Sequence, residues 1–175
     1  IAGFSVGVVD QNKIFQKKKI KKNNLILAIP SNGVHSNGYS LIKYVIVKKI
    51  INLKKNKFLK KELLKPTKIY VKEVLNLIKN NLINGCANIT GGGLEDNIKR
   101  IIPKGLTADI NLDKIKTKKI FSWLKENNIE DKEMLRTFNC GVGFCIIVDP
   151  KNINKVKKFF TKKYKPYVIG KINSG

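Results

Sequence analysis

The stretch L-I-L-A-I-P-S-N-G-V-H-S-N-G-Y-S-L-I-K-Y-V-I at residues 25–46 indicates how the chain folds. Residues 25–29 form a short apolar run that Pro30 ends, as is typical of a buried strand. A loop of small polar residues follows, and apolar side chains then recur at helical spacing from Tyr39 to Ile50. A strand, a glycine-containing loop and an amphipathic helix in this order predict a domain in which helices pack on a sheet.

Outward from this unit, strand-like and helix-like segments alternate along the chain. Further strands are expected at residues 3–9 (with 13–16 as a hairpin partner), 86–89, 107–110, 142–148 and 167–172. Further helices are expected at residues 71–79, from 94 to before Pro103, and at 121–126, 132–138 and 153–162. Residues 52–61 are expected to be a lysine-rich connector. We therefore expect a single α/β (α+β) domain over residues 1–175, with a mixed β-sheet covered by helices.

The chain is strongly basic, with 36 Lys and Arg against 12 Asp and Glu and a net charge of +24. Such a charge can bind nucleic-acid phosphates. However, all the basic residues except Arg100 and Arg136 are lysine, whereas base-reading sites favour the guanidinium fork. The lysines are also spread along the chain, and Asn and Ile are over-used with them, which is typical of A/T-rich coding sequence. A specific nucleic-acid partner is therefore not expected.

The remaining composition points to an intracellular globular domain. Three cysteines, Cys86, Cys140 and Cys145, form no C-x-x-C pair, so we expect reduced thiols and no metal site in a cytoplasmic protein. No apolar run approaches the roughly 18 residues that a membrane span needs, so no membrane partner is expected. The chain lacks a starting Met, and we interpret it as a piece of a longer protein.

Two loops carry the candidate chemistry: S-N-G-V-H-S-N-G at residues 31–38 and T-G-G-G at 90–93. Each lies between a predicted strand and a predicted helix. Glycine lets a ligand approach the backbone, and free N–H groups at a helix start favour an anion, so both loops suit a phosphate ester. Each could equally be a tight turn. His35 is the only histidine, and it is either an acid, base or donor near neutral pH or a structural hydrogen-bonding residue.

The sequence resembles one enzyme family over nearly its whole length. The strings that carry the resemblance are A-G-F-S-V-G-V-V (2–9), I-P-S-N-G-V-H-S-N-G-Y-S-L-I-K (29–43), L-L-K-P-T-K-I-Y-V-K (63–72), N-I-T-G-G-G-L-E-D-N-I-K-R-I-I-P (88–103), E-M-L-R-T-F-N-C-G-V-G (133–143) and Y-V-I-G-K-I (167–172). They are similar to aminoimidazole ribonucleotide synthetase, also called phosphoribosylformylglycinamidine cyclo-ligase. The chain resembles the C-terminal domain of that family.

The resemblance implies a step of purine biosynthesis. The family uses ATP to phosphorylate the amide oxygen of formylglycinamidine ribonucleotide, after which the amidine-side nitrogen closes the imidazole ring of 5-aminoimidazole ribonucleotide. It also implies an N-terminal domain that supplies most of the ATP and magnesium site and the homodimer contact. The implied partners are thus formylglycinamidine ribonucleotide, ATP, Mg2+ and that N-terminal domain, and the isolated C-terminal domain would be inactive.

The resemblance also assigns site residues. His35 would be catalytic, the neighbouring Ser31, Asn32, Gly33, Ser36 and Asn37 would line the reacting part of the substrate, and Thr90, Gly91, Gly92 and Gly93 would hold its ribose phosphate. Asn139 and Gly141 would shape the cleft, and no metal ligand is expected. The family usually has His where this chain has Asn88, which cannot titrate, and often Arg where this chain has Lys68.

Two alternatives remain open from the sequence. The first is a related ATP-dependent enzyme of the same superfamily, such as one like formylglycinamidine ribonucleotide synthase, which the strings H-S-N-G and F-N-C-G-V-G disfavour. The second is a basic nucleic-acid-binding module, for which the net charge is the only argument.

Overall fold

The computed structural model describes residues 3–11, 14 and 16–175. Within these residues, five strands form one sheet in the order β2-β4-β1-β5-β3. The strands are β1 (Leu25–Pro30), β2 (Gly85–Asn88), β3 (Leu106–Ile110), β4 (Val142–Val148) and β5 (Tyr167–Ser174). Every neighbouring pair runs antiparallel. The expected fold class of helices on a sheet is confirmed, but the expectation of a mixed sheet is wrong, because all four strand pairs are antiparallel.

The central strands are apolar because helices cover both of their faces. Side chains of a strand point alternately to opposite faces, so a strand covered on both sides is continuously apolar. On one face, α3 (Val71–Lys79) and α7 (Ile153–Lys157) bury Leu77 and Val156 against Leu27 and Ile146. On the other face, Leu94 and Ile98 of α4 (Gly93–Lys99) pack into a second cluster of buried apolar side chains, which includes residues of the strands.

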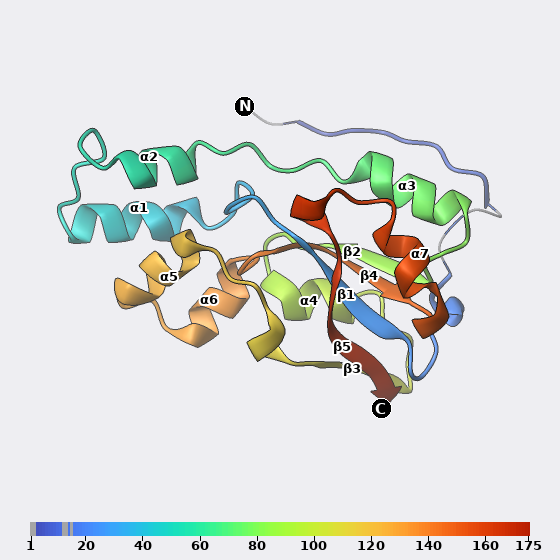
Figure 1. Cartoon of the computed structure of the whole chain (residues 1–175). Helices are drawn as coiled ribbons and strands as arrows, with labels where there is room; N and C mark the ends of the chain where they lie inside the picture. The colour runs from blue at the N-terminus through green and yellow to red at the C-terminus, as the bar shows by residue number, and fades with distance from the viewer. Residues whose placement is uncertain (1–2, 12–13, 15) are drawn as a thin grey trace.

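A second group of helices lies beside one end of the sheet (Figure 1). It consists of α1 (Tyr39–Lys48), α2 (Lys57–Leu63), α5 (Lys119–Glu126) and α6 (Asp131–Thr137). Their shared core includes Ile42, Leu59, Phe121 and Met134, all 3% exposed or less. Short 3₁₀ turns lie at Lys17–Lys19, Leu112–Lys114, Pro150–Asn152 and Lys162–Tyr164. Loop 31–38 therefore leads from the sheet into this helical group.

Three further sequence expectations are wrong in the described residues. Residues 3–9 form no strand: they run outside the folded part in Figure 1, and Phe4, Val6 and Val8 are at least 87% exposed. Their proposed hairpin partner lies partly outside the described residues. Residues 52–61 are not simply a connector, because α2 begins at Lys57 and buries Leu59. The last helix, α7, ends at Lys157 rather than extending to residue 162.

Candidate functional site

Loop 31–38 is held by contacts from distant parts of the chain. The Ser31 amide donates to the Gly141 carbonyl oxygen at 2.8 Å, and the Asn139 side chain donates to the Gly33 carbonyl oxygen at 2.9 Å. Asn139 also accepts a hydrogen bond from the Gly141 amide at 2.9 Å. The buried Asn139 side chain thus joins this loop to the start of β4. Asn139 and Gly141 are both buried.

The connector between α2 and α3 closes the other side of this loop. Asn32 Nδ2 donates to the Pro66 carbonyl oxygen at 2.7 Å, and the hydroxyls of Ser36 and Thr67 lie 3.2 Å apart. Gly38 caps α1 with a φ of +72° and no side-chain hydrogen bond, and an added Cβ there would lie 2.1 Å from the Phe138 ring. Both the left-handed backbone and the packing of Phe138 therefore require glycine at position 38.

His35 lies at the centre of the loop and is 5% exposed. Its Nε2 atom is 2.6 Å from Asn32 Oδ1, 3.2 Å from the Asn32 amide nitrogen and 3.5 Å from the Lys68 amide nitrogen. Burial, together with the positive charge of Lys118, lowers the pKa of His35 from 6.5 to about 4. The imidazole is therefore neutral at physiological pH. Of the roles that the sequence left open, this disfavours an acid and leaves a base, a donor or a structural hydrogen-bonding residue.

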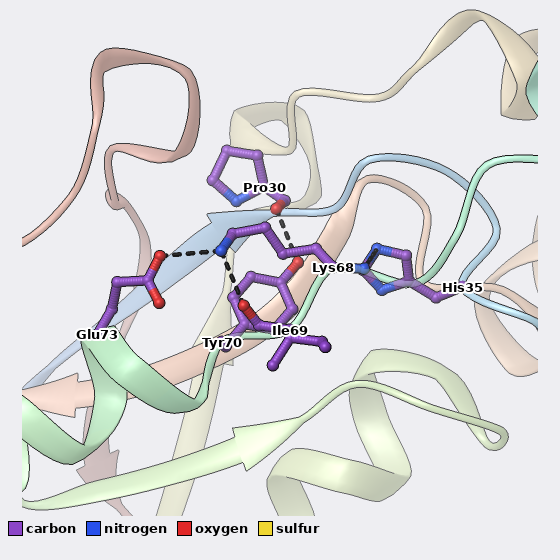
Figure 2. A network of polar contacts seen from close by, with 6 residues as sticks. All are labelled: Pro30, His35, Lys68, Ile69, Tyr70 and Glu73. Carbon is purple, nitrogen blue, oxygen red and sulfur yellow. Dashed lines mark hydrogen bonds and ion pairs between the residues drawn. The ribbon is translucent and has the colours of Figure 1, made fainter.

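A tyrosine that the sequence analysis did not single out supports this histidine. Tyr70 stacks near His35 with ring centroids 6.0 Å apart and donates from its hydroxyl to the Pro30 carbonyl oxygen at 2.8 Å (Figure 2). An added Cβ at Gly143 would lie 1.9 Å from the Tyr70 hydroxyl and 2.6 Å from His35 Cε1. Only glycine fits at this position of β4. In the sequence, Tyr70 was visible only as part of the string I-Y-V-K beside the P-T-K connector. Its contact with His35 could not be predicted without the fold.

Lys68 does not point into the candidate site. Its side chain runs toward Glu73 in Figure 2, where Nζ lies 2.9 Å from Glu73 Oε1 and donates to the Ile69 carbonyl oxygen at 2.9 Å. The ammonium group also lies 4.7 Å from the ring centroid of Tyr164. The pKa of Glu73 is lowered: burial opposes the shift, but the Lys68 hydrogen bond and charge outweigh it. Lys68 is therefore a structural residue, whose ammonium group contacts a carboxylate, a carbonyl oxygen and an aromatic ring.

Loop 90–93 is held by its own helix. The buried Asn97 of α4 donates from Nδ2 to the carbonyl oxygens of Gly93, at 2.7 Å, and Gly91, at 3.3 Å, while its Oδ1 accepts from the Thr90 hydroxyl at 3.3 Å. Gly92 and Gly93 have φ values of +90° and +65°. An added Cβ at Gly93 would lie 1.8 Å from the Leu135 carbonyl oxygen. Gly93 thus serves packing against α6, whereas Gly91 is exposed.

The two loops meet at Asn37 and Gly91. An added Cβ at Gly91 would lie 3.8 Å from Asn37 Oδ1, its nearest neighbour. The predicted site residues divide into two groups by burial. Asn32, Ser36, Asn37, Thr90, Gly91 and Gly92 reach the surface, while Ser31, Gly33, His35, Gly93, Asn139 and Gly141 are buried. Ser31 Oγ is the one buried side-chain polar atom without a hydrogen-bond partner in the described part of the chain.

Other features lie apart from this site. A hollow of about 690 Å³ lies between α4 and β3 and is lined mainly by apolar side chains such as Ile98, Leu106 and Ile110. Asn88 is exposed on β2 and pairs with Phe144 in the sheet. Among the described residues, no three His, Cys, Asp or Glu side chains gather in a way that could hold a metal ion. None of the described helices has the length and apolar character needed to cross a bilayer.

The fold and the sequence together define the class of this domain. Residues 21–175 match the family "AIR synthase related protein, C-terminal domain", and the chain belongs to that family. Solved structures share the fold at low identity. PurL of T. maritima complexed with FGAR has a TM-score of 0.59 at 13% identity, covering 94% of this chain and 26% of that one. Thiamine monophosphate kinase from Aquifex aeolicus has a TM-score of 0.54 at 14% identity, covering 91% and 50%.

Curated relatives are much more similar in sequence. Phosphoribosylformylglycinamidine cyclo-ligase of Streptococcus agalactiae is 41% identical over 177 residues, which cover 98% of this chain and 52% of the relative. The enzyme of the same name from Streptococcus pyogenes is 42% identical over the same coverage. The chain therefore spans about half the length of the curated relatives it matches.

Proposed function

We propose that this chain supplies one wall of the active-site cleft of a phosphoribosylformylglycinamidine cyclo-ligase. The observation that carries the proposal is the meeting of loops 31–38 and 90–93, near Asn37 and Gly91, in a chain 41% identical to enzymes of that name. In this proposal the chain binds formylglycinamidine ribonucleotide and takes part in its ATP-dependent closure to 5-aminoimidazole ribonucleotide. The work would be done in the cytoplasm, as a step of purine biosynthesis.

In loop 90–93, the backbone at Gly91 and Gly92 reaches the surface and suits the ribose phosphate of the substrate. Asn97 satisfies the carbonyl oxygens of this loop, and the amide groups of Gly91 and Gly92 have no hydrogen-bond partner among the described residues. Backbone N–H groups of this kind can bind a phosphate without a charged side chain. Asn37, Ser36 and Asn32 then extend the polar surface toward His35.

His35 would act on the reacting nitrogen. Ring closure requires the attacking amidine-side nitrogen to lose a proton while phosphate leaves the activated carbon. A neutral imidazole can accept such a proton, and because burial and the charge of Lys118 lower the pKa of His35 to about 4, the ring passes the proton on to solvent rather than keeping it at pH 7. Asn139 and Gly141 would act indirectly, because they hold the loop on which His35 lies.

Magnesium does not fit the described residues of this chain, since they offer no cluster of acidic or imidazole ligands. The phosphates of ATP carry the metal in many phosphoryl transfers, and oxygen ligands are the rule for Mg2+. We therefore propose that the part of the curated relatives not matched by this chain contributes the ATP and metal site and the homodimer contact. No role in this proposal depends on a metal held by the residues described above.

The test is reconstitution. The 175-residue chain is mixed with the separately expressed unmatched half of the Streptococcus agalactiae relative, and conversion of formylglycinamidine ribonucleotide to 5-aminoimidazole ribonucleotide is followed with ATP. We expect turnover only when both parts and ATP are present, and loss of turnover with His35→Ala. Unchanged kinetics for His35→Ala would remove this residue from the site. Formation of formylglycinamidine ribonucleotide from formylglycinamide ribonucleotide, ATP and an ammonia source would instead favour the synthase-like alternative.

A further inference from the structure

We propose that Asn32 is a positioning residue that fixes the tautomer of His35, with the proton on Nε2 and the lone pair of Nδ1 free to accept a ligand donor. The catalytic meaning of this inference rests on the proposed function. The tautomer itself does not, because it follows from hydrogen bonds within the chain.

The orientation of the Asn32 amide is fixed first. Asn32 Nδ2 lies 2.7 Å from the Pro66 carbonyl oxygen and donates to it. If the amide were turned around, Oδ1 would take this place, and two acceptor oxygens would face each other with no proton between them. The Pro66 carbonyl therefore directs Asn32 Oδ1 toward His35.

The proton on the ring follows from the amide. Asn32 Oδ1 is 2.6 Å from His35 Nε2, and a side-chain carbonyl oxygen has no proton to donate. Contact at this distance requires a proton on the ring nitrogen, because two lone pairs would otherwise face each other. The backbone amides of Asn32 and Lys68 also point at Nε2, and alone they would favour a lone pair there, but their distances are 3.2 and 3.5 Å. The shortest contact decides, since hydrogen bonds weaken with distance.

The opposite ring nitrogen has no partner in the described part of the chain. A neutral imidazole with a proton on Nε2 has a lone pair on Nδ1. No described residue forms a hydrogen bond with Nδ1, and Ser31 Oγ alone among the described side-chain polar atoms is both buried and unpaired. Nδ1 is therefore not completely enclosed, although His35 as a whole is only 5% exposed. Gly143 lies against Cε1 on the remaining edge of the ring, which limits its rotation.

This arrangement defines the chemical group that His35 can receive. An open Nδ1 lone pair accepts an N–H or O–H donor and cannot donate to an acceptor. The ligand atom at this position is therefore a nitrogen or hydroxyl that carries a proton. Under the proposed function, the amidine-side nitrogen of the substrate is of that kind.

Nuclear magnetic resonance tests the inference directly, because His35 is the only histidine of the chain. The protein is labelled with 15N-histidine, and long-range 1H–15N correlations at pH 7 report which ring nitrogen carries the proton. We expect a proton on Nε2. In Asn32→Leu the oxygen acceptor is gone while the two backbone amides remain, so we expect the proton to move to Nδ1. A proton on Nδ1 in the unchanged protein, or on Nε2 in Asn32→Leu, would overturn the proposal.

Two further variants keep the test sharp. Asn37→Leu makes the same substitution in the same loop, where Asn37 Nδ2 donates to the His35 backbone carbonyl and not to the ring, and it should leave the proton on Nε2. If Asn32→Leu does not fold, Asn32→Asp retains an acceptor, so Nε2 should stay protonated while the pKa of His35 rises. An unchanged pKa in Asn32→Asp would contradict the contact. If reconstitution gives no turnover, the proposed function fails, but the correlation spectra still decide the tautomer.

Discussion

Loops 31–38 and 90–93 both lead from a strand into a helix, but different parts of the chain hold them. Loop 31–38 is tied to residues 31 to 106 positions away, through Thr67, Pro66 and Asn139. Loop 90–93 is tied to Asn97, four to seven positions away on the helix that it opens. The first loop therefore depends on the assembled fold, whereas the second is largely a local unit. A catalytic ring that needs a fixed position fits the first, and a backbone phosphate site fits the second.

The largest effect is expected at Gly93, where the local loop meets α6. Gly93→Ala places a Cβ 1.8 Å from the Leu135 carbonyl oxygen at a φ of +65°. Both the backbone and its neighbour must shift, and we expect a loss of about 5 kcal/mol in the free energy of unfolding, or a failure to fold. Urea denaturation measures it. A loss below about 1 kcal/mol would show that α6 can move away from this loop.

Asn139→Ala tests the dependence of loop 31–38 on distant parts of the chain. The variant leaves the Gly33 carbonyl and the Gly141 amide without their buried partner. At 1–3 kcal/mol for each unsatisfied group, we expect a loss of about 4 kcal/mol in the free energy of unfolding. Asn80→Ala is the matched control, since Asn80 is exposed and bonds only within its own helix, and it should cost about 0.5 kcal/mol or less. Equal losses in the two variants would contradict the long-range support of the loop.

Sequence patterns predicted the regular elements better than the contacts that hold the loops. The bounds of α3 and β4 agree with the sequence expectation, because their apolar side chains follow the period of a helix and of a buried strand. The alternation at residues 3–9 also fits a strand, but no described segment pairs with it. Alternation specifies which side chains suit a sheet and not whether a partner strand is present.

The candidate site shows the same division. The glycines and His35 stand out locally, in two short strings, and could be singled out without a fold. The structural roles of Asn139, Tyr70 and Gly143 could not, because each depends on contacts across the chain, such as the 106 positions between Asn139 and Gly33. Gly92 and Gly93 were assigned to substrate phosphate, and the structure gives both a backbone reason as well, since their φ values are positive.

The two loops should differ in how their contribution to stability depends on pH, because only loop 31–38 contains a histidine. The pKa of His35 is lowered from 6.5 to about 4, so the unfolded chain binds a proton in that window and the folded chain does not. The contribution of His35 is therefore complete above pH 6.5 and decreases as the pH falls to 4, by about 3 kcal/mol. In His35→Gln this decrease should be absent, which paired denaturation curves at pH 7 and pH 4 would show. Asn97→Ala, which removes the α4 side chain that holds loop 90–93, should lower stability equally at both pH values, and a pH-dependent loss in this variant would contradict the distinction.

The smallest effect on stability and the most selective effect on binding are expected at Gly91. Gly91→Ala adds a Cβ whose nearest neighbour is Asn37 Oδ1 at 3.8 Å, so stability should change by about 0.5 kcal/mol or less. The same Cβ would stand beside the amides proposed to bind phosphate, and we expect binding of inorganic phosphate to weaken roughly tenfold, equivalent to about 1.4 kcal/mol. Titration followed by amide chemical shifts measures this. Gly7→Ala, at an exposed glycine with nothing within 4 Å of its added Cβ, is the matched control and should bind as the unchanged chain does. If Gly91→Ala also binds unchanged, the Gly91 and Gly92 amides do not bind the phosphate.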